Sequence, residues 1–191
     1  MKKYFFSLLL VGSFSFSQSV ENLKLETKKF YEANYLMDFE VIIAAYYPKM
    51  VESIGKEKML LETEKQFENE EYRLRFQLET VPFLFGKITK KQNQSFCVVR
   101  CRNPIRYFFE TKLTDEKAIE KATWLKKINK TTEVTFEPKR NSFNVRRSTV
   151  FIAIIDENTN NQWKFFNLDD AKQIELFQTL FGESLLKELG L

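Results

Sequence analysis

Histidine is absent from this chain of 191 residues, and cysteine, proline and glycine are scarce, with two, four and five residues respectively. The absence of histidine excludes any catalytic dyad or triad that uses an imidazole. With only two cysteines and no CxxC spacing, the sequence also argues against a zinc site. No glycine-rich phosphate loop or other catalytic signature is present, so we expect no metal and no cofactor.

Long apolar runs are also missing, apart from a short one at the amino terminus. Lysines at positions 2 and 3 precede an apolar run over residues 4–11, and the small residues Ser15 and Ser17 follow it. This order is typical of a secretory signal peptide, and the run is too short to span a bilayer. We therefore expect residues 1–18 to be removed after Ser17 or Gln18. The mature protein is then periplasmic or secreted, with no lipid anchor and no stable membrane insertion.

The charge of the chain is nearly balanced. The sequence has 30 basic and 26 acidic residues, a formal net charge of +4. Removing the two lysines of residues 1–18 would leave 28 basic against 26 acidic side chains, a net charge of +2. Such a balance does not favour nucleic acid or an anionic membrane as a partner. Twenty phenylalanines supply apolar area for one core, so residues 19–191 are expected to form a single domain.

The two cysteines, Cys97 and Cys101, are four residues apart in a segment that reads as a strand. On an extended chain this spacing separates their Cα atoms by roughly 13 Å, whereas a disulfide tolerates about 7 Å. Two buried free thiols are therefore expected. An intermolecular bridge in an oxidising compartment is the alternative.

The first third of the mature chain has helical periodicity. Asp38 stands at an N-cap position, Pro48 cannot continue a helix, and Gly55 is a natural stop. The pattern predicts helices over residues 20–35 and 39–45 and a break or kink over 46–48. It then predicts a short helical turn over 50–54 and a helix over 56–69.

Alternating apolar and polar residues then predict strands, with a helix over 114–128 inserted among them. A strand pair over 95–102 and 105–111 is expected to be interrupted at Asn103 and Pro104. Residues 150–155 are apolar at every position, which predicts a central strand covered on both faces. The remaining elements are strands over 72–79, 132–136, 143–155 and 162–167, a turn over 158–161, and a helix capped by Asp169 or Asp170.

The order of these elements resembles the NTF2-like superfamily, whose fold is a cystatin-like, cone-shaped α+β cup. The segments that carry the resemblance are Tyr47–Val51, Gly55–Met59 and Asn161–Phe165. The resemblance implies an α+β fold with N-terminal helices packed in a curved, mostly antiparallel sheet, plus an inserted helix and a C-terminal helix. It also implies an apolar pocket between sheet and helices, and a homodimer formed through the sheet.

Superfamily members include isomerases, dehydratases, transport adaptors and proteins with no known activity, so the resemblance fixes little about function. Tyr46, Tyr47, Tyr107 and Trp163 are candidates to line the pocket, because each combines an apolar ring with a polar atom. The alternative is that they are ordinary core aromatics.

Our leading hypothesis is a binding or assembly module for a small apolar or amphipathic ligand or a partner chain. The alternative is an isomerase or lyase that uses Asp38 or Glu110 as a base and Tyr46 or Tyr107 to hold an oxyanion. Asp38 also fits a helix cap. A third hypothesis is a structural protein whose phenylalanines fill the pocket.

Basic residues form two groups, one at Arg100, Arg102 and Arg106 and the other over residues 139–147. No glycine-aromatic signature of an RNA-binding sheet accompanies them. They are therefore assigned to a solvated outer face of the sheet.

Overall fold

A computed structural model describes residues 20–77 and 79–191. The expected signal peptide, residues 1–18, lies outside the described residues. The chain is helical over residues 20–36, and none of the described helices is long and apolar enough to cross a membrane. The other helices are α2 (Phe39–Ala45), α3 (Pro48–Ile54), α4 (Lys56–Phe67), α5 (Asp115–Ile128), α6 (Ala171–Phe181) and α7 (Glu183–Glu188), with short 3-10 turns at Pro138–Arg140 and Glu157–Thr159.

The strands form one open antiparallel sheet, so the expected α+β fold with a curved antiparallel sheet is confirmed. The main order is β1-β4-β6-β5, while β2 and β3 also pair with β4 and β7 pairs with β6. The strands are β1 (Tyr72–Phe76), β2 (Phe83–Phe85), β3 (Thr89–Lys91), β4 (Gln94–Phe109), β5 (Val134–Glu137), β6 (Ser142–Ile155) and β7 (Lys164–Asn167).

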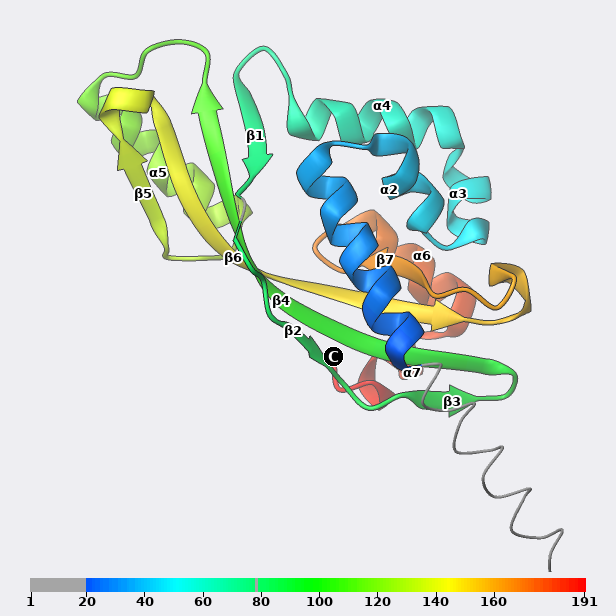
Figure 1. Ribbon diagram of the computed structural model, residues 1–191. Coiled ribbons are helices and arrows are strands. Elements are labelled where there is room, and N and C mark those ends of the chain that lie inside the picture. The colour runs from blue at the N-terminus through cyan, green and yellow to red at the C-terminus, as the bar shows by residue number, and fades with distance from the viewer. Residues whose placement is uncertain (1–19, 78) are drawn as a thin grey trace, which may run out of the picture.

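Strands β4 and β6 are much longer than the others and run the length of the molecule (Figure 1). Their pairing continues from Ser95 opposite Ile155 to Phe108 opposite Ser142. At one end β1 and β5 flank this pair, and at the other end β2, β3 and β7 flank it. The sheet therefore has two ends that share the same two central strands.

One face of the sheet, here called the inner face, carries Val99, Cys101, Asn103, Ile105 and Tyr107 of β4. Residues directly opposite on β6 share that face, since side chains alternate along a strand. The helix over residues 20–36 covers one end of the inner face, and α5 covers the other. Ring contacts mark both sites: Phe30 stacks on Phe165 at 4.9 Å, and Trp124 meets Tyr107 at 6.3 Å.

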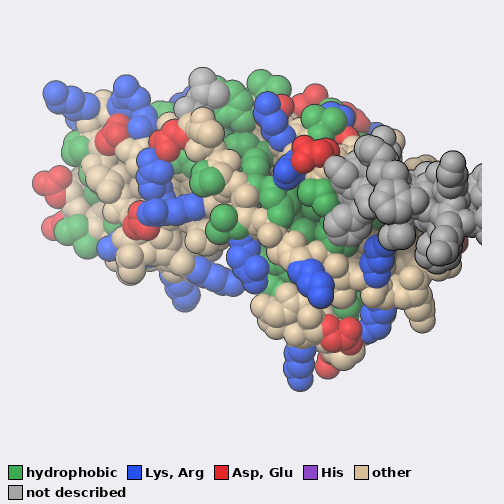
Figure 2. All heavy atoms as spheres, turned by 60° about the horizontal axis from the view of Figure 1, so that its bottom comes forward, with side chains coloured by type: hydrophobic (Ala, Val, Ile, Leu, Met, Phe, Trp, Pro, Cys, Tyr) green, Lys and Arg blue, Asp and Glu red, His purple; other side chains and the backbone are tan. Residues whose placement is uncertain are grey.

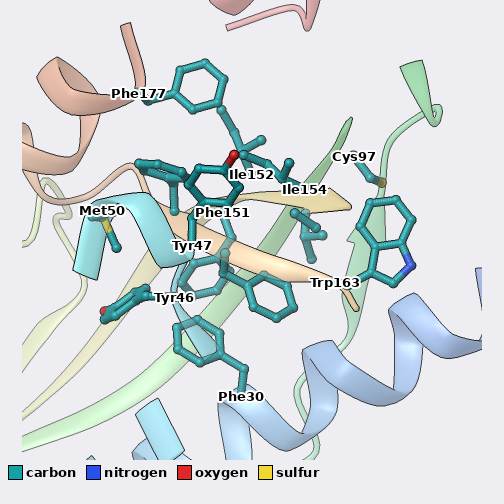
Figure 3. Close-up of a cluster of buried hydrophobic side chains, with 14 of the residues drawn as sticks. Phe30, Tyr46, Tyr47, Met50, Cys97, Phe151, Ile152, Ile154, Trp163 and Phe177 are labelled. Atoms are coloured by element: carbon teal, nitrogen blue, oxygen red, sulfur yellow. The ribbon is translucent and has the colours of Figure 1, made fainter. Parts of the chain in front are cut away.

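The outer face is covered only at the end that carries β7. There Phe177 of α6 meets Phe96 and Phe166 edge to face. In Figure 3, Phe30 and Phe177 approach the strands from opposite sides, with Ile152 and Ile154 between them. Ile152 and Ile154 on the outer face and Ala153 on the inner face are all completely buried, which confirms the prediction of a central strand covered on both faces.

The local signals at the helix ends are confirmed. Asp38 caps α2 by accepting a hydrogen bond from the Val41 amide at 3.1 Å, and α3 begins at Pro48. Gly55, with a φ of 93°, both ends α3 and begins α4. Thr114 caps α5 and Asp170 caps α6 through side-chain oxygens.

The expected interruption at Asn103 and Pro104 is wrong, because β4 passes through both residues. The carbonyl of Pro104 accepts the Gln77 amide at 2.9 Å. The amide and carbonyl of one strand residue point to the same neighbour, so the donor that proline lacks would face Gln77. Proline therefore costs only the reciprocal bond to Gln77, just beyond the end of β1, where the interruption of the ladder does least harm. The short strands β2 and β3 were not predicted.

The doubly covered strand gives a stability prediction. Ile152→Ala should lower the free energy of unfolding by about 2–5 kcal/mol, because it leaves a cavity between two packed layers. Leu84→Ala, at a side chain that is 67% exposed on the outer face, should change it by less than about 0.5 kcal/mol. Urea denaturation measures both values. Equal losses for the two variants would contradict this assignment of the core.

Candidate functional site

The four aromatic residues predicted to line a pocket do not converge on one cavity. Tyr46, Tyr47 and Trp163 belong to the core cluster beneath the N-terminal helix, whereas Tyr107 belongs to the cluster beneath α5. Tyr46 and Trp163 lie on opposite sides of the first cluster (Figure 3). Trp163 is 1% exposed.

Tyr47 has a structural role. Its hydroxyl donates to the buried Asp156 carboxylate at 2.8 Å, and Gln94 and Asn158 donate to the same oxygen at 3.0 and 3.3 Å. Burial, followed by the contact with Asp156, raises the pKa of Tyr47. This cluster fixes the turn after β6 against the start of α3.

Tyr46 and Tyr107 are buried and keep their protons. Burial raises the pKa of Tyr46 to about 12, partly offset by a hydrogen bond with Gln173 and by Arg147. Burial also raises the pKa of Tyr107, whose hydroxyl donates to Asn129 at 3.2 Å. Arg147 lowers the pKa of both phenols, as a positive charge does.

The two carboxylates of the enzyme hypothesis lie outside any such cluster. Asp38 is exposed and serves as the cap of α2. Glu110 is exposed and accepts a hydrogen bond from Arg73 at 2.6 Å. Neither carboxylate shares a cavity with Tyr46 or Tyr107, which that hypothesis requires.

A groove of about 610 Å³ lies where a pocket between helix and sheet was expected. One wall is a stripe of the N-terminal helix that contains Lys24, Lys28, Tyr31 and Tyr35. The other wall consists of residues 77, 79–81, 83 and 85, which follow β1 and continue into β2. The lining of the groove, here called the inner groove, is Lys24, Lys28, Tyr31, Glu32, Tyr35, Gln77, Glu79, Thr80, Val81, Phe83 and Phe85.

Tyr31 forms the inner wall of this groove. Its ring meets Phe76 and Phe83 edge to face, each at 5.6 Å. Its hydroxyl is buried and has no hydrogen-bond partner in the described part of the chain. Burial raises the pKa of Tyr31 to about 12, with further contributions from Cys101 and Glu79. A buried hydroxyl without a partner is energetically costly, and a bound ligand or water could satisfy it.

Beyond Tyr31, polar residues cross the inner face between the two core clusters. Asn103 donates to Thr149 at 2.8 Å and accepts from the Cys101 thiol at 3.0 Å. Arg147 lies directly opposite Asn103 and therefore shares this face. These four residues, Cys101, Asn103, Arg147 and Thr149, are here called the polar junction.

The assignment of Arg147 to the solvated outer face is wrong. Arg146 is on that face, exposed and paired with Glu79 at 3.0 Å, so its neighbour in an extended strand points the other way. Arg147 is partly buried, and its Nε atom is buried without a partner. The alternation of Phe143 and Val145 with Asn144 and Arg146 carried this signal. Extended by two residues, this alternation places Arg147 on the same face as Phe143 and Val145.

The remaining arginines named in the sequence do lie on the outer face. Arg102 pairs with Glu133, and Arg106 pairs with Glu137 at 3.1 Å. In the view of Figure 2, basic side chains lie among acidic ones, with hydrophobic side chains between them. These pairs fit a solvated surface more closely than a docking platform for an anionic polymer.

Two further hollows are present. One of about 630 Å³ lies between α2, α3 and the turn after β6, and of the four predicted pocket residues only Tyr46 is in the lining of this hollow. Lys164, which also lines it, is bonded to the Ala44 carbonyl at 2.7 Å. The other, of about 420 Å³, lies beside α5 and is lined mainly by charged residues, including Glu70, Glu71 and Lys121.

The sequence matches no protein-family model, and no curated protein is detectably similar to it. Within residues 20–77 and 79–191, no three histidine, cysteine, aspartate or glutamate residues are grouped so that they could hold a metal ion. The inner groove and the polar junction are therefore the features on which a function can be argued.

The two buried cysteines are free, as predicted. Burial raises the pKa of Cys97 to about 11 and that of Cys101 to about 12. At pH 8 about one thiol in a thousand, or fewer, is therefore ionised. Iodoacetamide should modify neither thiol of the native protein at an appreciable rate, and should modify both in guanidinium chloride. Rapid modification of the native protein, followed by mass spectrometry, would contradict this burial.

Two tyrosine substitutions should change stability in opposite directions. Tyr31→Phe removes an unsatisfied buried hydroxyl and should raise the free energy of unfolding by about 1 kcal/mol. Tyr47→Phe removes a hydrogen bond to a buried carboxylate and should lower it by about 1.5–3 kcal/mol. Thermal and urea unfolding of both variants measure the difference. If Tyr31→Phe is as destabilising as Tyr47→Phe, the Tyr31 hydroxyl has a partner within the protein.

Proposed function

We propose that this protein is an exported, non-catalytic binding module of NTF2-like form that holds a small apolar or amphipathic molecule in the inner groove. The observation that carries the proposal is the groove itself, an apolar hollow between helix and sheet with a partnerless tyrosine hydroxyl at its inner wall. Its volume of about 610 Å³ falls in the range of small-molecule pockets.

The lining supports an amphipathic ligand better than a purely polar one. The apolar surface available to a hydrocarbon chain comes from Tyr35, Val81, Phe83 and Phe85. The charged residues of the lining include Lys24, Lys28 and Glu79. Lys24 and Lys28 are exposed and pair with Glu21 and Glu32 on their own helix. The apolar part of the groove would therefore provide most of the binding energy.

The alternative of an isomerase or lyase has less support. It requires a carboxylate base and a phenol in one cavity, and both proposed carboxylates are exposed and engaged elsewhere. A homodimer through the sheet remains a prediction. It would have to be formed by the outer face, where Arg102, Arg106 and Arg146 already have acidic partners within the chain.

Filling the groove tests the proposal. Val81→Trp places a large ring in the groove, whereas Leu84→Trp adds the same ring to an exposed site on the outer face of β2. Native mass spectrometry and thermal shifts with a panel of single-chain amphiphiles should show binding to the wild type and to Leu84→Trp. Val81→Trp should bind at least about tenfold more weakly, equivalent to about 1.4 kcal/mol.

Binding of every panel member to Val81→Trp with wild-type affinity would place the site elsewhere. No binding to the wild type at all would reject the proposed function.

A further inference from the structure

Arg147 is the basic residue of the polar junction, and its position there follows from the pairing of β4 with β6. The register places it opposite Asn103, between Val145 and Thr149 along its own strand. Val145 belongs to the core cluster beneath α5, while Cys101 belongs to the cluster beneath the N-terminal helix. Its side chain therefore emerges between two apolar regions.

Within the part of the chain that the structure describes, Arg147 has no salt bridge, and its buried Nε has no hydrogen-bond partner. The buried groups on which it acts are Tyr46, Cys101 and Tyr107. Burial raises the pKa of all three, and they are neutral at physiological pH. A buried guanidinium nitrogen without a hydrogen-bond partner is unfavourable, and a carboxylate is the acceptor that would satisfy it best.

The inner groove lies on the path to this guanidinium. Phe83, in the groove wall, pairs with Cys101, and Gln77 bonds to the Pro104 carbonyl. Arg147 is one strand further across the same face, so its backbone lies roughly 10 Å from the groove wall, or two strand spacings. An extended arginine side chain covers much of that distance. Tyr31 lines the groove, and Cys101, opposite Phe83, lies on β4 between the groove wall and β6.

The nearby charges limit the size of the anion. Asp169 raises the pKa of Cys101, whereas Arg147 lowers it, so the two opposite charges act on the same thiol. Asp169 is exposed and forms no salt bridge with Arg147 within the described ranges. A ligand with several negative charges would be repelled by Asp169. A single carboxylate can pair with both nitrogens of the guanidinium fork and adds only one charge.

We propose that the ligand of the inner groove is a single-chain carboxylic acid, whose hydrocarbon chain lies on Tyr35, Val81 and Phe83 and whose carboxylate pairs with Arg147 at the polar junction. The proposal rests on the proposed function and specifies the class of ligand. In this arrangement the carboxylate supplies the counter-charge that the guanidinium lacks. The Tyr31 hydroxyl donates to the same carboxylate.

Octanoate, octanol and octylamine have the same hydrocarbon chain and differ only in the head group. Comparing their affinities therefore measures the contribution of the head group. Isothermal titration calorimetry of the wild type at pH 7.5 should show octanoate binding about 10- to 100-fold more tightly than octanol, with octylamine the weakest. Arg147→Met should bind octanoate no more tightly than octanol. Arg100→Met removes an equal charge from the exposed outer face and should retain the wild-type preference.

The unliganded variants provide a second measurement. Because the buried Nε of Arg147 has no partner among the described residues, Arg147→Met should unfold at the same temperature as the wild type or a higher one. Octanoate should no longer raise that temperature. Arg147→Lys keeps the charge without the planar fork and should bind octanoate with intermediate affinity.

The outcomes separate the two proposals. Equal binding of octanoate and octanol to the wild type, or an unchanged preference in Arg147→Met, would overturn the carboxylate assignment and leave the groove as a binding site. An Arg147→Met protein that fails to fold would show that Arg147 stabilises the fold itself, which also overturns the assignment. If none of the three probes binds the wild type, the proposed function fails as well.

Discussion

The antiparallel ladder between β4 and β6 determines the arrangement of the rest of the structure. It joins Ser95 with Ile155 at one end and Phe108 with Ser142 at the other, and both core clusters are built on it. The register also decides which side chains face the helices. A slip of one residue would move Phe151 and Val99 to the opposite face and bring Arg146 and Arg100 inward, so burial on the inner face strongly specifies the observed pairing.

The same two strands serve two apolar clusters, and the clusters do not merge. Between them the inner face carries Cys101, Asn103, Arg147 and Thr149, where a continuous apolar stripe would have joined the two ends. The amide of Asn103 is satisfied by Thr149 and Cys101, so this part of the junction is structurally complete. Arg147 and Tyr31 are different, because each keeps a buried polar atom without a partner in the described part of the chain, as Thr27 and Ser142 also do. Such exceptions are uncommon in folded proteins, and the proposed ligand would satisfy those of Arg147 and Tyr31.

Much of the fold could be predicted from local chemistry. Asp38, Pro48, Gly55 and Thr114 each act through their own backbone or side chain, and the helix boundaries follow from them. The continuity of β4 through Pro104 could not be predicted in this way. It depends on the end of β1 opposite Ile105, which is a property of the assembled sheet. Tyr46 and Tyr107 likewise lie far apart because the β4–β6 pair carries two separate core clusters, with one tyrosine in each. The sequence around neither tyrosine indicates which cluster it will join.

The long ladder also has a consequence for how the chain folds. β4 ends at Phe109 and β6 begins only at Ser142, after α5 and β5, so the central pairing closes a long loop. Pairing of this kind is slow, because the loss of chain entropy precedes the gain from contacts. During synthesis the N-terminal helices would be complete well before the strands on which they rest, and their phenylalanines would be exposed to other chains. Early association with a chaperone would protect this surface until β6 has formed.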